Sequence, residues 1–297
     1  MKSADPNFTE VSDDALLGKA LVIVGAPRSG TTFVANIINR HPDLAYIGEP
    51  RLIWRYGNDG KSDLLRPEDA RPAVKRYVRS SFAAEVRRQG RARLITKSPE
   101  NSLRMPFVDQ ILPDCRYVHI IRNGLDSVLS IRQRWLSHGA GVTSLRWRKR
   151  LKEMKLRQAP AAAVEVLRRL VPRRFRPFVG RGVWGPRIPG LGGLLHDLEL
   201  LEVCCLQWRL CVEAARHAGQ HLPPDRYLEI RLEELSDDLM RRILDFCGLD
   251  DDAAVWSCFR EQFDPARPGG RTGHADPAEV ERIMQWIGPT MQWLGYT

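Results

Sequence analysis

Short apolar segments alternate along the chain with longer segments whose apolar residues recur at helical spacing. The short segments are rich in β-branched residues and predict strands at 21–24, 45–48, 93–96, 116–121 and 226–231. The longer segments predict helices at 31–39, 66–89 with a break at Pro72, 101–112 with a kink or restart at Pro106, 126–136, 194–219, 237–247 and 278–296. Strands that alternate with helices are typical of a parallel sheet with right-handed crossovers. The pattern therefore predicts an α/β fold, in which helices flank a parallel β-sheet.

Two segments depart from this alternation. Residues 1–18 are mostly polar and predict a flexible leader. Residues 137–195 are dense in Arg and Lys, with Trp, Leu and Val interleaved, and contain too few apolar residues to fold alone. We therefore expect a single domain over residues 1–297 that carries 137–195 as a basic insertion or lid. A solvated charged surface would explain this insertion. An acceptor-binding lid and a contact of 145–187 with an anionic membrane surface are the competing hypotheses.

The composition adds an excess of positive charge to this picture. Among the 297 residues, Lys and Arg number 46 and Asp and Glu number 36, so the formal net charge is +10. This charge suits an anionic ligand, an acidic acceptor or an anionic surface. No nucleic-acid-binding motif accompanies the charge, so we expect no specific nucleic-acid partner.

The cysteine pattern bears on the compartment and on metal binding. The six cysteines form no CxxC pair and no Cys/His spacing typical of zinc, and no Asp/Glu/His cluster suggests another metal. Cys204, Cys205 and Cys211 lie in a predicted helix and are expected to be buried apolar groups. The N-terminal segment lacks the apolar stretch of a signal peptide, and no apolar run is long enough to span a bilayer. We therefore expect a cytoplasmic protein that needs no metal.

A glycine-bounded turn joins the first predicted strand to the first long helix. Gly25 and Gly30 bracket four residues, as in a Walker A loop. Thr31 stands where the Walker lysine would be, Thr32 occupies the Ser/Thr position, and a basic residue, Arg28, lies inside the loop. Free backbone N–H groups at a helix start bind anions, whereas the missing lysine argues against ATP or GTP hydrolysis. Glycines that serve only the turn are the simpler explanation, but strand, loop and helix in this order favour an anion site.

The residues of this loop also carry a family resemblance. The sequence A-P-R-S-G-T-T, followed by a helix and then N-R-H-P, resembles the 5′-phosphosulfate loop of the PAPS-dependent sulfotransferases. It is similar to the tyrosylprotein sulfotransferase branch and to bacterial enzymes with the same loop. The resemblance implies the P-loop NTPase-like sulfotransferase fold, with PAPS as donor and PAP as product. It also implies cofactor contacts from the loop residues Arg28, Ser29, Gly30, Thr31 and Thr32.

A second anion site is expected after the strand at 116–121. Arg122 follows this strand, and Ser130 lies two turns into the next helix. A guanidinium grips a phosphate with two N–H bonds, and a hydroxyl adds a third. The segment from Arg122 to Ser130 resembles the 3′-phosphate site of the sulfotransferases. Two phosphate sites fit a donor with two separated anionic groups, as in PAPS, and ATP has no 3′-phosphate.

The catalytic assignments rest on the same resemblance. Glu49 lies 21 residues after Arg28, which is the offset of the catalytic glutamate in tyrosylprotein sulfotransferases, and this implies a general base. Arg51 would contact the acceptor. Lys97, at the end of a strand, resembles the family lysine that touches the transferring sulfate, and with Arg28 it would stabilise the leaving phosphate. His119 is the rival base, although its place inside a strand favours a core histidine.

The C-terminal third contributes weaker assignments. Leu232 replaces the tyrosine usual in the family pattern, so no cofactor contact is carried over to it. Arg271, in a Gly/Pro/Arg loop at 264–277, resembles part of a loop that closes over the cofactor and would meet the 3′-phosphate.

The sequence thus predicts a PAPS-dependent sulfotransferase that acts on a hydroxyl or amine. The acceptor stays open among a carbohydrate, a lipid, a natural product and a peptide. Two alternatives remain: an ATP-dependent small-molecule kinase with a modified P-loop, and a non-catalytic anion- or nucleic-acid-binding protein.

Overall fold

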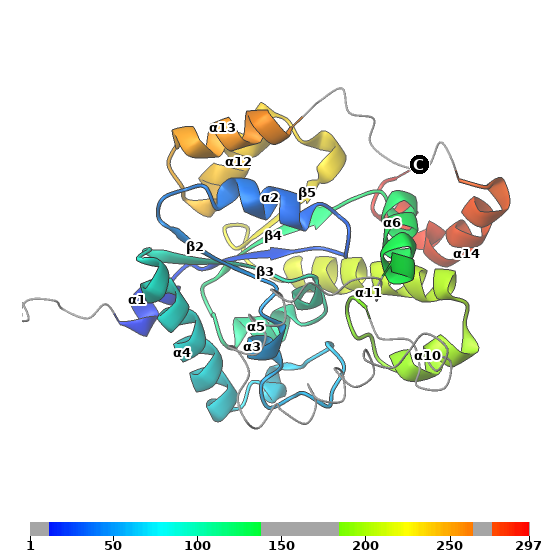
Figure 1. Cartoon of the computed structure of the whole chain (residues 1–297), viewed down its shortest axis with the longest axis horizontal. Coiled ribbons are helices and arrows are strands. Elements are labelled where there is room, and N and C mark those ends of the chain that lie inside the picture. Colours follow the sequence, from blue (N-terminus) through cyan, green and yellow to red (C-terminus); the bar gives the residue numbers. More distant parts are fainter. Residues whose placement is uncertain (1–11, 138–183, 264–274, 297) are drawn as a thin grey trace, which may run out of the picture.

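A computed structural model of the chain describes residues 12–137, 184–263 and 275–296. Within them, five parallel strands form one sheet in the order β2-β3-β1-β4-β5 (Figure 1). The strands are β1 (Leu21–Val24), β2 (Leu44–Gly48), β3 (Arg93–Lys97), β4 (Arg116–Ile121) and β5 (Tyr227–Arg231). All five predicted strands are confirmed, and their ends shift by at most one residue. The predicted class, a parallel sheet flanked by helices, is confirmed as well.

Helices cover both faces of this sheet (Figure 1). Helices α2 (Thr31–Ile38), α12 (Asp237–Cys247) and α13 (Ala253–Gln262) pack on one face. Helices α1 (Asp13–Leu17), α3 (Arg51–Arg55), α4 (Pro72–Gln89) and α5 (Met105–Asp109) pack on the other. Consecutive residues of β1 enter opposite cores, Leu21 with Ile23 on one side and Val22 with Val24 on the other. Burial on both faces explains why this strand is a continuous apolar run with no polar alternation.

A third apolar cluster lies beside the sheet and is built mainly from helices (Figure 1). It joins α6 (Gly124–Ser137), α10 (Leu191–Asp197), α11 (Leu200–Gly219) and α14 (Pro277–Trp293). All six cysteines are free and buried, so the expectation for Cys204, Cys205 and Cys211 is confirmed. No helix in the described ranges is both long and apolar enough to cross a bilayer.

Three predicted helices are divided in the structure. The segment 66–89 splits into a 3₁₀ turn (Pro67–Asp69) and α4, because Pro72 is suited to the first turn of a helix. The segment 101–112 becomes a 3₁₀ turn, η2 (Pro99–Leu103), followed by α5. The segment 194–219 is interrupted at Glu199, which caps α11 in a capping box with Glu202. Helices α1, α3 and α13 were not predicted.

The structure describes only part of each unusual segment. Residues 1–11 lie outside the described residues, but Asp13–Leu17 forms a helix whose Leu16 and Leu17 are buried against the sheet. The end of the predicted leader is thus a short helix packed on the sheet, and the leader as a whole stays a prediction. Of the predicted insertion, 138–183 lies outside the described residues. Its end is packed into the helical cluster through Ile188 and Leu191.

The topology gathers the candidate site at one edge of the sheet. Parallel strands present their carboxyl ends at the same edge, so the residues after β1, β2, β3 and β4 meet there. The chain leaves β1 toward β2 and β3 on one side and later returns to β4 and β5 on the other. Such a switch point is where open α/β sheets bind ligands.

Candidate active site

The loop between β1 and α2 is fixed by its own hydrogen bonds. Gly25 donates its backbone N–H to Ser102 Oγ at 2.8 Å, and Ser29 Oγ donates to the carbonyl of Ala26 at 2.7 Å. Arg28 and Gly30 have positive φ angles of 70° and 88°. Because the Ser29 hydroxyl is buried and bonded within the loop, it shapes the loop. The result is a rigid concave turn of the kind that binds anions.

The first turn of α2 offers unpaired backbone N–H groups. Its N-cap, Gly30, has no side chain to accept from them, and the first intrahelical bond runs from Val34 N to Gly30 O at 3.1 Å. The N–H groups of Thr31 and Thr32 precede that bond. Thr31 is buried and Thr32 is exposed. Together with the helix dipole, this turn suits a phosphate group.

Gly25 is required by the close approach of β4. Its φ is 150°, and a Cβ atom here would lie 2.4 Å from the backbone oxygen of Ile120. We expect Gly25→Ala to lower the free energy of unfolding by about 2–4 kcal/mol, because a backbone oxygen cannot rotate away. Denaturant titration measures this loss. Gly192→Ala is the control, since a Cβ there meets nothing within 4 Å, and equal stability of the two variants would refute the steric argument.

Arg28, Arg122 and Ser130 come together in the structure. Arg28 Nε donates to Ser130 Oγ at 2.9 Å, and Arg122 Nη1 donates to the carbonyl of Arg28 at 3.3 Å. Arg122 also lies 3.7 Å from Asp126. Sequence reasoning placed Arg28 and Ser130 at opposite ends of a ligand, whereas here they are hydrogen-bonded partners. The two expected anion sites therefore form one continuous cationic surface.

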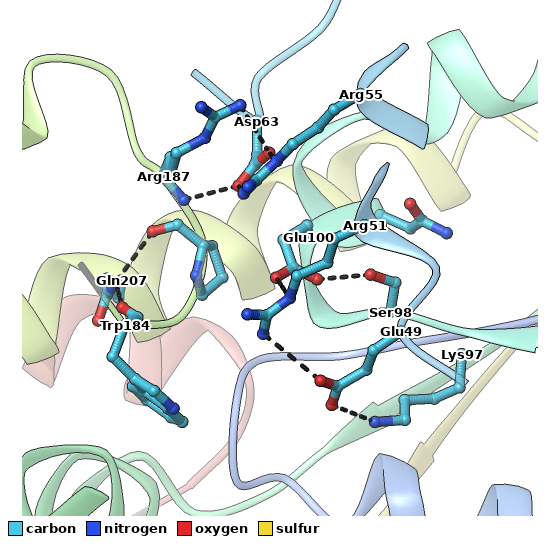
Figure 2. A network of polar contacts seen from close by, with 12 residues as sticks. Glu49, Arg51, Arg55, Asp63, Lys97, Ser98, Glu100, Trp184, Arg187 and Gln207 are labelled. Atoms are coloured by element: carbon cyan, nitrogen blue, oxygen red, sulfur yellow. Dashed lines mark hydrogen bonds and ion pairs between the residues drawn. The ribbon is translucent and has the colours of Figure 1, made fainter. Parts of the chain in front are cut away.

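Glu49 lies between two cations at the end of β2 (Figure 2). Its Oε1 is 2.7 Å from Lys97 Nζ, and its Oε2 is 3.5 Å from Arg51 Nη2. Lys97 is buried, whereas the Glu49 side chain is 44% exposed. The backbone φ of Glu49 is 50°, and its N–H donates to the Lys97 carbonyl at 2.7 Å. The carboxylate is therefore held in its charged form by two cations, on a constrained backbone, with part of its surface open to a ligand.

Sequence reasoning missed Glu100, which lies behind Arg51. Its side chain is fully buried, and Oε1 is 2.7 Å from Arg51 Nε. This contact is an ion pair between two buried side-chain atoms. Ser98 Oγ donates to the other oxygen, Oε2. In the sequence, the only sign of Glu100 is its position three residues after Lys97. A carboxylate in an ordinary turn can have the same spacing.

A second buried carboxylate, Asp63, joins three arginines nearby, and Figure 2 shows it with Arg55 and Arg187. It accepts from Arg55 Nε and Nη2 at 2.9 and 2.8 Å, and Arg104 Nη1 lies 3.4 Å away. The backbone N–H of Arg187 donates to it at 2.7 Å. Burial alone would raise the pKa of Asp63, but the arginines outweigh it and hold the pKa at about 2. Burial lowers the pKa of Arg104 to about 10, so both groups stay charged at neutral pH.

Residues 184–188, which come after the segment 138–183 outside the described residues, are anchored to Asp63. Arg187 O accepts from the Asp63 N–H at 2.7 Å. On the other side, buried Gln207 of α11 donates to the carbonyls of Trp184 and Pro186 at 3.0 and 2.9 Å (Figure 2). Asp63 and Gln207 thus hold residues 184–188 from two sides.

The remaining candidates are accounted for as follows. His119 is fully buried, with Nδ1 2.7 Å from the Tyr227 hydroxyl and 3.3 Å from Glu229, which supports its place as a core histidine. Leu232 packs against Gly30, where a Cβ would lie 2.7 Å from its methyl groups. Arg271 lies outside the described residues. Within the described ranges, no three His, Cys, Asp or Glu side chains gather as metal ligands.

Comparison with known proteins relates this site to one family. A model of the sulfotransferase family matches residues 20–176. The match covers more than half of the chain, from β1 through α6, and includes the loop, Glu49, Lys97, Arg122 and Ser130.

Individual relatives are more distant. Nodulation protein NoeE of Sinorhizobium fredii is 24% identical over 129 residues, which are 38% of this chain and 31% of the relative. A putative protein-tyrosine sulfotransferase of Caenorhabditis briggsae is 25% identical over 162 residues, 49% of this chain and 57% of the relative. The chain thus spans about a third of the length of the first relative and somewhat over half of the length of the second. The crystal structure of sulfotransferase STF9 from Mycobacterium avium covers 94% of this chain and 77% of its own, with a TM-score of 0.52 and 14% identity. At that identity the likeness shows the fold alone.

Proposed function

The chain belongs to the sulfotransferase family, and we propose that it transfers a sulfuryl group from PAPS to a hydroxyl or amine of an acceptor molecule. The observation that carries the proposal is the meeting of three features at one sheet edge. These are the unpaired amides at the start of α2, the cationic surface of Arg28 and Arg122, and the Glu49–Lys97 ion pair.

The donor set suits a ligand with two separated anionic groups. The loop amides, with Thr31 and Thr32, would hold the 5′-phosphosulfate, and Arg122 with Ser130 would hold the 3′-phosphate. Arg28 reaches Ser130 and would stand between the two groups. Arg271 is proposed as a further 3′-phosphate contact. PAPS itself supplies the sulfuryl group when it is bound.

Glu49 is proposed as the base that takes the acceptor proton. Its side chain is the exposed member of the pair with buried Lys97, so an acceptor can reach it. Lys97 and Arg28 would place positive charge beside the phosphate end of the donor, where negative charge grows during transfer. Arg51, 3.5 Å from Glu49, would contact the acceptor. The proposal uses no metal.

The acceptor is proposed only as a class: a carbohydrate, lipid, natural product or peptide that bears a nucleophilic hydroxyl or amine. One relative is a putative protein-tyrosine sulfotransferase, which keeps a peptide among these options. We also propose a single domain in a reducing, cytoplasmic compartment, which the six free cysteines support. The modified-P-loop kinase is the second candidate, and Thr31 in place of the Walker lysine argues against it.

Calorimetric titration with PAP tests the donor assignment. We expect PAP to bind in the absence of metal and ATP with magnesium to bind far more weakly, because ATP has no 3′-phosphate for Arg122 and Ser130. Transfer from radiolabelled PAPS to a panel of the four acceptor classes then tests the reaction. Binding of ATP with magnesium and no binding of PAP at millimolar concentration would overturn the proposal in favour of the kinase.

Arg122→Ala should weaken PAP binding by about 10- to 100-fold, the range expected for charge-assisted hydrogen bonds to a phosphate. Adenosine 5′-phosphate lacks the 3′-phosphate, so its affinity should hardly change. Arg134→Ala is the matched control, because it removes the same charge from an exposed position of α6. Equal losses for both nucleotides would dismiss the 3′-phosphate assignment.

A further inference from the structure

We propose that Glu100 is a positioning residue that fixes the carboxylate of Glu49 by holding Arg51. The inference rests on the proposed function of Glu49 and names a residue that neither the sequence pattern nor the comparisons assign. It starts from a fully buried carboxylate at the site edge, which is costly unless it is paired and hydrogen-bonded.

The surroundings of Glu100 fix its own position. The residue lies in the 3₁₀ turn η2, between β3 and α5, and every residue of that turn is buried. Ser98 Oγ donates to Oε2, and Arg51 Nε lies 2.7 Å from Oε1. The positive charge of fully buried Arg104 also acts on this carboxylate. Glu100 is therefore a rigid anionic anchor on the framework of the sheet.

Arg51 transmits that position to Glu49. Its guanidinium is planar, so holding Nε also fixes the direction of Nη2, which lies 3.5 Å from Glu49 Oε2. The other oxygen of Glu49 is held by Lys97 at 2.7 Å. Glu100 thus sets a contact that orients the carboxylate, and Figure 2 shows the three side chains in this order. A base displaced by a fraction of an ångström loses much of its efficiency.

The structure also shows why Glu49 needs outside support. Its φ of 50° is a left-handed conformation that residues with a side chain rarely adopt. The backbone bonds from Glu49 N to Lys97 O and from Arg51 N to Glu49 O, at 2.7 and 2.8 Å, hold it in this conformation. Arg51 therefore braces Glu49 through both its backbone and its side chain.

The test is a double-mutant cycle on Glu100 and Arg51. Glu100→Gln keeps the shape and removes the charge, and Arg51→Met keeps the length and removes the guanidinium. We expect each single variant to lower kcat by about 10- to 50-fold, while the Kd for PAP stays within about twofold. If Glu100 acts through Arg51, the double variant is no slower than Arg51→Met alone. Independent losses that multiply would overturn the proposal, because a purely structural Glu100 would act whatever residue stands at 51.

A control separates positioning from general stability. Glu229→Gln removes a partly buried carboxylate of β5 that pairs with Arg216 of α11 and with His119 of β4. It should lower the thermal unfolding temperature and leave kcat unchanged. If Glu229→Gln lowers kcat as much as Glu100→Gln does, the effect of Glu100 is one of stability and the proposal fails.

Arg51→Lys keeps the inference testable if Glu100→Gln does not fold. Lysine preserves the charge but lacks the fork that spans both carboxylates. We expect it to lose kcat as Arg51→Met does, and wild-type kcat in Arg51→Lys would overturn the proposal. A wild-type protein that neither binds PAP nor transfers sulfuryl would instead refute the proposed function. Normal transfer by both wild type and Glu100→Gln would refute only the positioning role.

Discussion

Replacement of Glu49 by glutamine is expected to lower sulfuryl transfer by about 10²- to 10⁴-fold, the usual contribution of a general base. The amide has nearly the same shape but cannot take the acceptor proton. PAP should still bind with the same or higher affinity, because the change removes a negative charge beside Lys97 and Arg51. Loss of transfer with retained nucleotide binding separates a catalytic role from damage to the donor site.

Single-turnover rates with radiolabelled PAPS measure this loss, and calorimetry with PAP measures the binding. Glu68→Gln is the control, because it makes the same chemical change at an exposed residue of the short turn Pro67–Asp69. Transfer that continues at the wild-type rate in Glu49→Gln would remove Glu49 as the base. That result would not by itself make His119 the base, because His119 is fully buried and paired with Tyr227.

Local sequence patterns predicted the framework of the site well, for identifiable reasons. The bounds of β4 and α12 match the prediction, because an apolar run and a Gly248 C-cap in the left-handed conformation mark them clearly. Glu49 and Lys97 were both assigned to strand ends. Neighbouring parallel strands bring such residues together, and the structure places Oε1 and Nζ 2.7 Å apart.

Helix interruptions were harder to predict because they depend on caps within a continuous periodic pattern. The apolar stripe runs through 194–219, yet Leu198 is extended and Glu199 starts a new helix. Helix α1 was missed for the opposite reason. Its five residues give too short a pattern, and its burial comes from contact with α4 and the sheet.

Buried charge pairs could not be predicted from the sequence at all. Asp63 and Arg187 are 124 positions apart, and nothing local marks Asp63 as buried. A solvated charge gives the same sequence pattern as one enclosed by three arginines. Their pairing follows from tertiary packing, so Glu100 and Asp63 emerge only once the fold brings their partners together.

Asp63→Asn should be the most destabilising of the charge substitutions considered, at about 3–5 kcal/mol. The change is nearly isosteric, so it removes the charge and replaces one accepting oxygen by a donating amide nitrogen. Without that charge, fully buried Arg104 loses its acidic partner at 3.4 Å, and Arg55 loses a two-point ion pair. The carboxylate oxygen that accepts the Arg187 N–H is also altered, which weakens the anchor of residues 184–188. Urea titration of the folded protein measures the loss.

The same variant should change the response of stability to acid. The pKa of Asp63 is about 2 in the folded protein, whereas an unperturbed aspartate, as in the unfolded chain, has a pKa of 3.8. The charge of Asp63 therefore stabilises the fold above about pH 4. This contribution, about 2 kcal/mol from the shift, is lost as pH falls from 4 toward 2. Asp63→Asn should therefore lose less stability than wild type over that interval, whereas Asp250→Asn, at an exposed position, should follow wild type. Parallel stability curves for wild type and Asp63→Asn between pH 7 and pH 2 would show that the ion pairs of Asp63 do not hold the fold together.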